Sequence, residues 1–359
     1  MLQDVHDELY HAQNLREEIF HLSEEPFNLP EWSEVGQDEA LVTGLPNIPV
    51  LLTSDIHYGE VVDPVEIDGV NCNVEVANKR IERLTNNTIL KLRGKGGKKA
   101  PGIVICRLGD TVSGDIHNEL DKTNALGPIA AAVECAKQEC RMIETFRKEF
   151  KNVWIVSVPG NHGRTTKKPE SKNFVETSYD SISTMFIEKH FEKAKNVSFL
   201  TPKSGEAFFP VYGTNFLAIH GDRIGAKGGT GFIGVSATIA KGQYKTRQKY
   251  AQEGKYIDWV LMGHFHRHLK LEHTIVNSNM PGYNQYARDL KLEAEYPSQT
   301  LFMVHPRLGV VDVSEIYVSH REEMKEDMAI FKKTKAHEPA QKYVQPSFIK
   351  FGKGRNGGR

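Results

Sequence analysis

The sequence predicts an α/β domain, and three observations carry this prediction. Between Ile48 and residue 320, short runs rich in valine and isoleucine alternate with longer segments whose apolar residues recur every three or four positions. Short runs bounded by turn residues are typical of strands covered on both faces, and the longer spacing is typical of helices that cover a sheet. The composition agrees, because 39% hydrophobic and 26% charged residues are ordinary values for a globular protein.

Eight strands and three helices make up this pattern. Five buried strands are predicted in the segments IPVLLTSD, IVICRLGD, VWIVSVPGNH, FLAIHGD and DWVLMGHFH. Three further strands are predicted in the segments LEHTIVNSN, TLFMVHP and GVVDVSEIYV. Helices are predicted at residues 75–93, 125–150 and 174–191, and the middle one places Ala132 and Ala136 on one apolar face.

The chain divides into three parts. Residues 1–45 are predicted to be an acidic, partly helical extension, because they hold eleven acidic side chains and Arg16 as the only Lys or Arg. Residues 46–320 form the main domain. Residues 321–359 are predicted to be a basic, disordered tail, since eight Lys or Arg oppose one Glu from residue 331 onward. This asymmetry favours a solvated acidic helix and a disordered basic tail, with electrostatic contact with a partner as the alternative.

Neither a membrane segment nor a disulfide framework is predicted. No run reaches the roughly 18 to 20 apolar residues of a membrane-spanning helix, and the N-terminus lacks the features of a signal peptide. The four cysteines, Cys72, Cys106, Cys135 and Cys140, have no CxxC spacing and are sparse for this length. We therefore expect a cytoplasmic protein with reduced thiols.

Each of the five buried strands ends in a polar cluster. The clusters are Asp55-Ile-His57, Gly109-Asp110, Gly160-Asn161-His162, His220-Gly-Asp222 and Gly263-His264-Phe-His266. Ligand sites in open α/β sheets gather beyond the carboxyl ends of strands, so we expect these side chains to converge. Carboxylate, amide and imidazole ligands suit Mn²⁺, Fe²⁺ and Zn²⁺. Seven such ligands exceed the needs of one ion, so we predict two ions that share Asp110 and a bridging hydroxide as nucleophile.

The order DxH, GD, GNH, H and GHxH resembles the signature of calcineurin-like metallophosphoesterases over residues 48–318. The resemblance implies a four-layer α/β/β/α sandwich of two mixed sheets, with a metal pair at one sheet edge and residues 46–320 as the catalytic domain. It implies two divalent ions as cofactors, with Mn²⁺ as the first choice and Fe²⁺, Zn²⁺ or Ni²⁺ as alternatives.

The resemblance also assigns roles to individual residues. Asp55, His57 and His266 bind the first metal, Asn161, His220 and His264 bind the second, and Asp110 bridges them. His162 and Asp110 are the catalytic residues, with His162 giving a proton to the leaving oxygen.

One departure concerns the residue after His162. The family commonly has Asp or Glu there, whereas this chain has Gly163 followed by Arg164. We expect either that another carboxylate takes that part or that leaving-group protonation is weaker. Arg164 is a candidate for binding phosphate oxygens, and His117 is a second candidate. A surface arginine and a solvent-exposed histidine are the alternatives.

The substrate prediction is a phosphodiester, with DNA or another nucleotide phosphodiester first. The chain looks similar to SbcD-like repair exonucleases and their phage-encoded relatives, which indicates a prokaryotic cell or a phage-infected host. Basic residues are predicted in loops that could contact phosphates. They are Lys91, Arg93, Lys95, Lys98, Lys99, Arg164, Lys167, Lys168, Lys241, Lys245, Arg247 and Lys249.

Three alternatives stay open. A small-molecule or cyclic-nucleotide phosphodiesterase is the nearest. A protein phosphatase is disfavoured, because Ser113, Gly114 and Gly163 replace residues of that branch of the family. A non-catalytic accessory module of a polymerase is disfavoured by the complete set of ligands. The predicted partners are the phosphate-ester substrate and either a second copy of the chain or a replication or repair protein.

Overall fold

The computed structural model describes residues 29–34, 46–67, 70–94, 100–225, 231–289 and 293–335. Most of the predicted acidic extension, and the part of the predicted tail from residue 336 onward, lie outside these residues.

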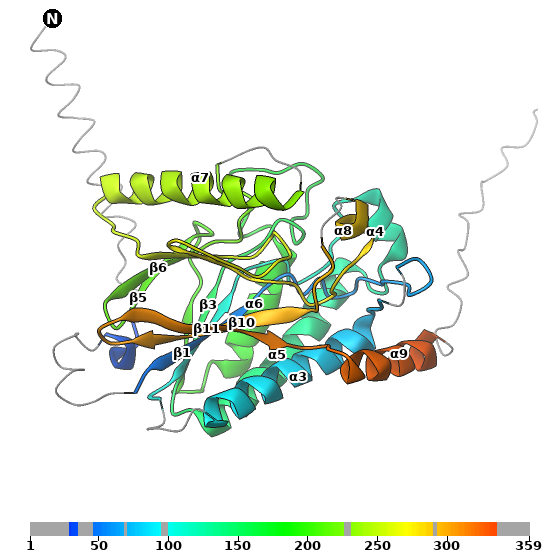
Figure 1. Cartoon of the computed structure of the whole chain (residues 1–359), viewed down its shortest axis with the longest axis horizontal. Helices are drawn as coiled ribbons and strands as arrows, with labels where there is room; N and C mark the ends of the chain where they lie inside the picture. Colours follow the sequence, from blue (N-terminus) through cyan, green and yellow to red (C-terminus); the bar gives the residue numbers. More distant parts are fainter. Residues whose placement is uncertain are drawn as a thin grey trace, which may run out of the picture.

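One of the two sheets is mixed and six-stranded, with the strand order β11-β10-β1-β2-β3-β4; strands β11, β10, β1 and β3 are labelled in Figure 1. Its strands are β1 (Ile48–Thr53), β2 (Ile103–Arg107), β3 (Val153–Ser157), β4 (Val197–Leu200), β10 (Ser298–His305) and β11 (Gly309–Tyr317). Strands β1 to β4 are parallel to one another, and β10 is antiparallel to β1. The carboxyl ends of β1, β2 and β3 therefore meet at one edge.

The other sheet is mixed and five-stranded, with the strand order β5-β6-β7-β9-β8. Its strands are β5 (Ala207–Val211), β6 (Thr214–Ala218), β7 (Trp259–Met262), β8 (Leu269–Leu271) and β9 (Thr274–Val276). Strands β6, β7 and β9 are parallel. All eight strands expected from the sequence are confirmed, although the segment LEHTIVNSN holds only the end of β8 and then β9.

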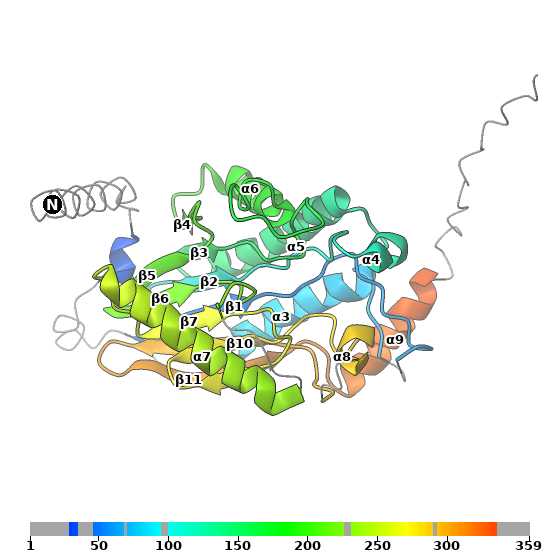
Figure 2. The ribbon, with the colours of Figure 1, turned by 90° about the horizontal axis from the view of Figure 1, so that it is seen from above.

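The helices of the described residues are α3 (Val74–Gly94), α4 (Asn118–Thr123), α5 (Pro128–Glu149), α6 (Tyr179–Phe191), α7 (Gly231–Gln252), α8 (Gln285–Asp289) and α9 (Glu322–Lys335), with the short 3₁₀ helix η1 (Glu31–Ser33) before β1. Helices α3, α5, α6 and α7 cover the outer faces of the two sheets, and the other helices lie at the ends of the domain or on α3. Helix α7 lies alone over one sheet, while α3 and α5 lie on the opposite side of the molecule (Figures 1 and 2).

Three apolar clusters show that these elements form four layers. Alternate residues of β1 to β3, such as Leu51 and Ile105, pack against α3, α5 and α6. The residues between them point the other way and meet the second sheet, with Trp154 against Phe209 at a ring-centroid distance of 5.3 Å. The outer face of the second sheet packs against α7 through residues such as Val260. The period of two along each strand produces this division.

The three predicted helices are confirmed with shifted starts. The third begins at Tyr179 rather than at residue 174, where Ser178 caps it by accepting a hydrogen bond from Asp180 N–H at 3.2 Å. Helix α7 was not expected, and its Lys241, Lys245 and Arg247 therefore lie on a helix rather than in a loop. Lys91 and Arg93 likewise lie in the last turn of α3. Lys95, Lys98 and Lys99 are outside the described residues.

The predicted boundaries at residues 45 and 320 need correction. Trp32, from the expected extension, packs edge-on against Trp154 at 6.5 Å between ring centroids, so η1 is part of the domain. At the other end, Glu322–Lys335 form α9 instead of a disordered tail. Helix α9 is held because Asp327 is fully buried and accepts hydrogen bonds from Arg80 and Arg83 of α3 at 2.9 and 2.7 Å.

Two further findings bear on the sequence predictions. Within the described residues, no helix is both long enough and apolar enough to cross a lipid bilayer. All four cysteines are buried free thiols, and burial raises the pKa of Cys72 to about 12 and that of Cys140 to about 11.

Candidate metal centre

The polar residues that follow β1 are held in an uncommon backbone conformation. Asp55 has a φ of 50° and His57 a φ of 44°, in the left-handed region that few residues other than glycine occupy. Asp55 N–H donates to Gly109 O and His57 N–H donates to Asp110 O, both at 3.0 Å. The loops after β1 and β2 therefore form one hydrogen-bonded unit.

The same conformation recurs at other candidate ligands. Asp110 has a φ of 51°, His264 of 70° and His266 of 55°. Each such residue costs on the order of 1–3 kcal/mol and persists only where its surroundings over-determine it. Five of the seven predicted ligands are strained in this way, which is typical of a functional site.

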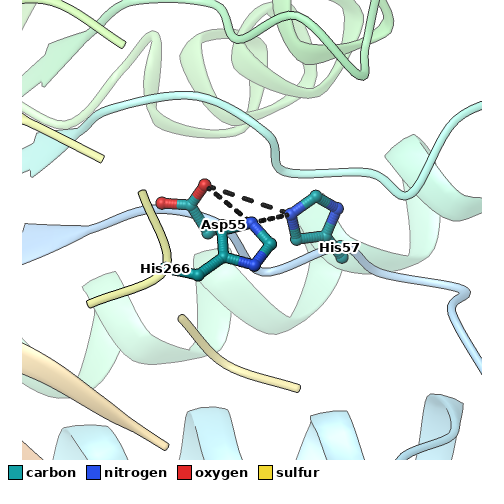
Figure 3. A group of neighbouring side chains, drawn as sticks. All are labelled: Asp55, His57 and His266. Carbon is teal, nitrogen blue, oxygen red and sulfur yellow. Dashed lines mark hydrogen bonds and ion pairs between the residues drawn. The ribbon is translucent and has the colours of Figure 1, made fainter. Parts of the chain in front are cut away.

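Asp55, His57 and His266 form the first donor group (Figure 3). The Nε2 atoms of His57 and His266 lie 3.0 Å apart, and Asp55 Oδ1 lies 3.5 Å from His266 Nε2. These three atoms come from loops more than two hundred residues apart in the chain, after β1 and after β7. They are brought together as the sequence predicts.

Asp110, His220 and His264 form the second donor group. His220 Nε2 lies 3.1 Å from Asp110 Oδ2 and 3.1 Å from Asn161 Oδ1. The other ring nitrogen of His220 faces Leu108 O at 2.7 Å, which orients the ring. His264 lies beside His220, with the ring centroids 5.0 Å apart.

Asp110 joins the two groups. Its Oδ2 atom lies 3.1 Å from His220 Nε2 and 3.9 Å from His57 Nε2, and its Oδ1 accepts a hydrogen bond from His162 N–H at 2.7 Å. All seven predicted ligands therefore converge at the edge where β1, β2, β3, β6 and β7 end.

Burial and charge set the protonation of this cluster. Burial lowers the pKa of His57 well below its usual value, and the neighbouring His162 adds to the effect. Burial also lowers the pKa of His264 to about 4, with His220 contributing. Both imidazoles are therefore neutral near pH 7 and offer lone pairs.

For Asp110 and His220, neighbouring charges outweigh the effect of burial on the pKa. Burial raises the pKa of Asp110, but the charges of His220 and His162 outweigh burial and lower it well below the usual range. Burial lowers the pKa of His220, but Asp110 outweighs burial and raises it to about 10. A cation that binds Asp110 would therefore compete with the proton on His220.

His162 lies at the open side of the cluster and is partly exposed. Its ring is 4.6 Å from the His57 ring, centroid to centroid, and its Nδ1 lies 2.9 Å from Ser113 O. A main-chain carbonyl thus orients this ring where the sequence suggested a carboxylate. Gly114 follows Ser113 with a φ of +69°, and a Cβ there would lie 2.0 Å from His162 O, so this close approach requires glycine.

Two predicted substrate residues have specific surroundings. The guanidinium of Arg164 donates to three main-chain carbonyls, at 2.9 Å to Asn161, 3.0 Å to Thr166 and 3.3 Å to Lys167. His117 is exposed, and its ring lies 5.9 Å from the His162 ring. Their roles toward phosphate stay predictions.

Sequence reasoning missed two carboxylates beside this centre. Asp180 of α6 is 2% exposed and accepts three main-chain hydrogen bonds, from Asp110, Thr111 and Gly160. Burial, followed by the charge of Asp110, raises its pKa. Glu60, just after the β1 loop, accepts a hydrogen bond from Asn284 Nδ2 at 2.9 Å, and burial raises its pKa. Neither belongs to a motif, so only a spatial contact could reveal them.

Comparison with known proteins assigns no family. No family model matches the chain, and no curated protein matches it. Solved structures that match include a candidate 5′-nucleotidase from Staphylococcus aureus in complex with alpha-ketoglutarate, at 11% identity and a TM-score of 0.35 over 80% of this chain. The present chain spans 58% of that protein.

A second match is a phosphopantetheinyl hydrolase from Mycobacterium tuberculosis, at 10% identity and a TM-score of 0.24, covering 65% of this chain and 88% of that one. Neither likeness is strong enough to carry an argument about function. The proposals below therefore depend on the site itself.

Proposed function

We propose that this chain is a phosphoesterase that depends on two divalent metal ions, with Mn²⁺ as the first candidate. The observation that supports it is a chain of three overlapping donor groups among the described residues: Asp55, His57 and His266; His57, Asp110 and His162; and Asp110, His220 and His264. Asp55 and Asp110 are 0% and 1% exposed, and two carboxylates buried side by side need cationic compensation. Imidazole nitrogens with carboxylate and amide oxygens suit first-row divalent ions.

The proposed ligands are those given by the sequence. Asp55, His57 and His266 would hold one ion, and Asn161, His220 and His264 the other, with Asp110 between them. Such a pair, when bound, would neutralise the charge of a phosphate and lower the pKa of a coordinated water.

The chain itself would supply the proton for the leaving oxygen. Ser113 O accepts from Nδ1–H of His162, so the ring would keep that proton and give the one on Nε2, which it carries in its cationic form. The ring stands beside His57 at the partly exposed side of the centre, where a substrate can approach. An imidazole suits this task because its ordinary pKa is near neutrality.

A phosphodiester of DNA or of another nucleotide is the proposed substrate class. Helix α7 contains no acidic residue, and Lys241, Lys245 and Lys249 are exposed at intervals of four positions, so they share one face. Lys167 and Lys168 are exposed in the loop after His162. Such charges supply sequence-independent affinity for phosphates that weakens with salt.

The test is a hydrolysis assay on purified protein with Mn²⁺. Bis(p-nitrophenyl) phosphate, p-nitrophenyl phosphate, labelled single- and double-stranded DNA and a cyclic nucleotide are compared. Asp55→Asn should abolish turnover, and His162→Ala should reduce it by about 10²- to 10⁴-fold. His190→Ala is the matched control, because this exposed histidine of α6 lies near Glu144 and outside the donor groups.

The outcomes separate the alternatives. Cleavage of the diester and of DNA supports the proposal, whereas turnover of the monoester alone would replace it with a phosphatase. Cleavage of the diester or cyclic nucleotide without DNA would select a small-molecule phosphodiesterase. Absence of metal-dependent cleavage, with DNA binding unchanged in Asp55→Asn, would select the accessory module. A second copy of the chain and a replication or repair protein remain predicted partners.

A further inference from the structure

Asp180 connects two of the loops that carry the donor atoms. Its Oδ2 atom accepts hydrogen bonds from Asp110 N–H at 2.9 Å and from Gly160 N–H at 2.8 Å, and its Oδ1 accepts from Thr111 N–H at 3.0 Å. Asp110 follows β2, whereas Gly160 immediately precedes Asn161 after β3. One carboxylate thus holds the main chain at two proposed ligands of the second ion.

Both oxygens of Asp180 face N–H donors, so the group acts as an acceptor on each side. Charge-assisted hydrogen bonds of this kind are about twice as strong as neutral ones. They also bear on strain, because Asp110 has a φ of 51° and needs surroundings that keep it there. The three bonds supply that restraint.

The loop after β3 packs closely against this carboxylate at Gly163. A Cβ on Gly163 would lie 2.8 Å from Ser178 Oγ and 2.9 Å from Asp180 Oδ1, so a side chain directly after His162 would displace the start of α6. Tyr179 N–H also donates to Gly163 O at 2.7 Å. The glycine and the carboxylate fit together as one contact.

The helix that carries Asp180 is itself fixed to β2. Arg107 donates to Ser183 Oγ at 3.0 Å and to Thr184 Oγ1 at 2.5 Å, both on α6. Glu139 of α5 accepts from Arg107 Nη2 at 2.7 Å and neutralises it. Asp180 therefore projects from a rigid support, as a residue that positions ligands must.

We propose that Asp180 is a positioning residue that holds Asp110 and the Gly160–Asn161 segment so that a second metal ion can bind. The inference rests on the proposed function. Asp180 touches no substrate and donates no atom to a metal. Its loss should weaken binding of the second ion more than binding of the first, because Asp110 and Asn161 both belong to the second. The first ion shares only Asp110, and its other ligands, Asp55, His57 and His266, have no hydrogen bond to Asp180.

The experiment measures Mn²⁺ binding directly on the full chain. Asp180→Asn keeps the shape but turns one acceptor into a donor that faces main-chain N–H groups, and Asp180→Ala removes both acceptors. Ser178→Ala is the matched control, because it weakens the cap of the same helix by about 1 kcal/mol and keeps the carboxylate. Calorimetric titration gives the stoichiometry, and electron paramagnetic resonance reports a spin-coupled Mn²⁺ pair.

Wild type and Ser178→Ala should bind two ions per chain and show the coupled signal. Asp180→Asn should bind the second ion about 10- to 100-fold more weakly and lose clearly less affinity for the first, which shares only Asp110 with it. Its kcat should fall by a similar factor with little change in KM, and excess Mn²⁺ should restore kcat. Thermal unfolding of each variant without metal shows whether it is folded. If Asp180→Ala does not fold, the conclusion is drawn from Asp180→Asn alone.

Three results would overturn one or both of these claims. If Asp180→Asn binds two ions with wild-type affinity and keeps its kcat, the positioning role is wrong and the proposed function stands. If both ions weaken equally, the role is structural and the inference is again wrong. If the wild type binds no Mn²⁺, the proposed function itself fails, and the inference fails with it.

Discussion

The two halves of the candidate metal centre are held by buried groups of opposite charge. Around Asp110, the anion Asp180 collects main-chain N–H groups. Behind Asp55, the cation Arg80 collects main-chain carbonyls, at 2.9 Å from Met280 O and 2.8 Å from Pro281 O. Each of the two charged side chains forms hydrogen bonds to buried main-chain groups that lie outside the strands and have no partner within a sheet.

The difference lies in how directly each charged group acts on the ligands. Asp180 binds the N–H of Asp110 itself. Arg80 acts one step away, because Met280 N–H donates to Asp55 O at 3.0 Å and Asn279 Nδ2 donates to His266 O at 3.0 Å. We call the side of the centre around Asp110 the anion-held half and the side around Asp55 the cation-held half. Metal binding and stability should therefore change more on a single substitution in the anion-held half.

The largest expected effect concerns the support of the anion-held half. Arg107 and Glu139 are 3% and 1% exposed, and Glu139 is the carboxylate that pairs with Arg107. Glu139→Gln should lower the free energy of unfolding by about 3–5 kcal/mol, because a buried guanidinium loses its counter-charge. Urea denaturation measures this loss. The double variant Arg107→Met/Glu139→Leu should recover most of it, and a double variant as unstable as the single one would contradict the explanation.

A smaller loss is expected behind Asp55. Asp327→Asn should lower the free energy of unfolding by about 1.5–3 kcal/mol. Arg80 keeps its carbonyl partners, and Arg83 keeps Glu326 at 2.6 Å. The same urea experiment compares the two halves. A loss that exceeds that of Glu139→Gln would reverse the proposed ranking.

In each half a glycine packs closely against the ligand carboxylate, Asp110 or Asp55. The two glycines therefore allow a matched pair of substitutions. A Cβ on Gly160 would lie 2.2 Å from Asp110 Oδ1, and one on Gly263 would lie 2.4 Å from Asp55 Oδ2. Gly160→Ala should weaken the second Mn²⁺ and Gly263→Ala the first, each by about 10- to 100-fold. Gly94→Ala is the control, because a Cβ there meets nothing within 4 Å.

Titration calorimetry resolves the two binding steps. If both alanine variants lose the same ion, the division of the centre into two halves is wrong. If neither variant loses affinity, the carboxylates move at no cost, and the tight packing of the glycines has no part in metal binding.

The smallest expected effect is at the exposed edge of the cation-held half. The hydrogen bond from Arg83 lowers the pKa of Glu326, whose side chain is half exposed. A lowered pKa in the folded state stabilises the fold above the unfolded pKa, and this contribution is lost as the pH falls through the folded pKa. Glu326→Gln should cost less than about 1 kcal/mol at pH 7.

The stability difference between Glu326→Gln and wild type should shrink as the pH falls below the ordinary glutamate range. Thermal unfolding at a series of pH values tests this. A cost at pH 7 as large as that of Asp327→Asn would show that Arg83 depends on the exposed partner rather than on the buried one.

Local sequence determined the strands, the order of the polar clusters and the set of donor residues. A run such as IVICR, short, apolar and β-branched, predicts a buried strand, and in the structure its apolar side chains alternate between two cores. A cluster such as Gly160-Asn161-His162 directly after a strand predicts a site at the sheet edge. Each apolar run and the polar cluster after it lie within a few residues of one another, so both can be recognised from the sequence alone.

Tertiary structure alone decided what surrounds those residues. Asp180 meets Asp110 across 70 positions, and Arg80 meets Asp327 across 247. Helix α9 falls in the predicted tail because residues 332–359 combine Lys, Gly and Pro with little periodicity, whereas the buried Asp327 ties it to α3. The ring of His162 likewise faces Ser113 O where a carboxylate was expected. A buried charge is stable only beside a compensating partner. Because these partners are distant in the sequence, only the packing of the elements brings them together.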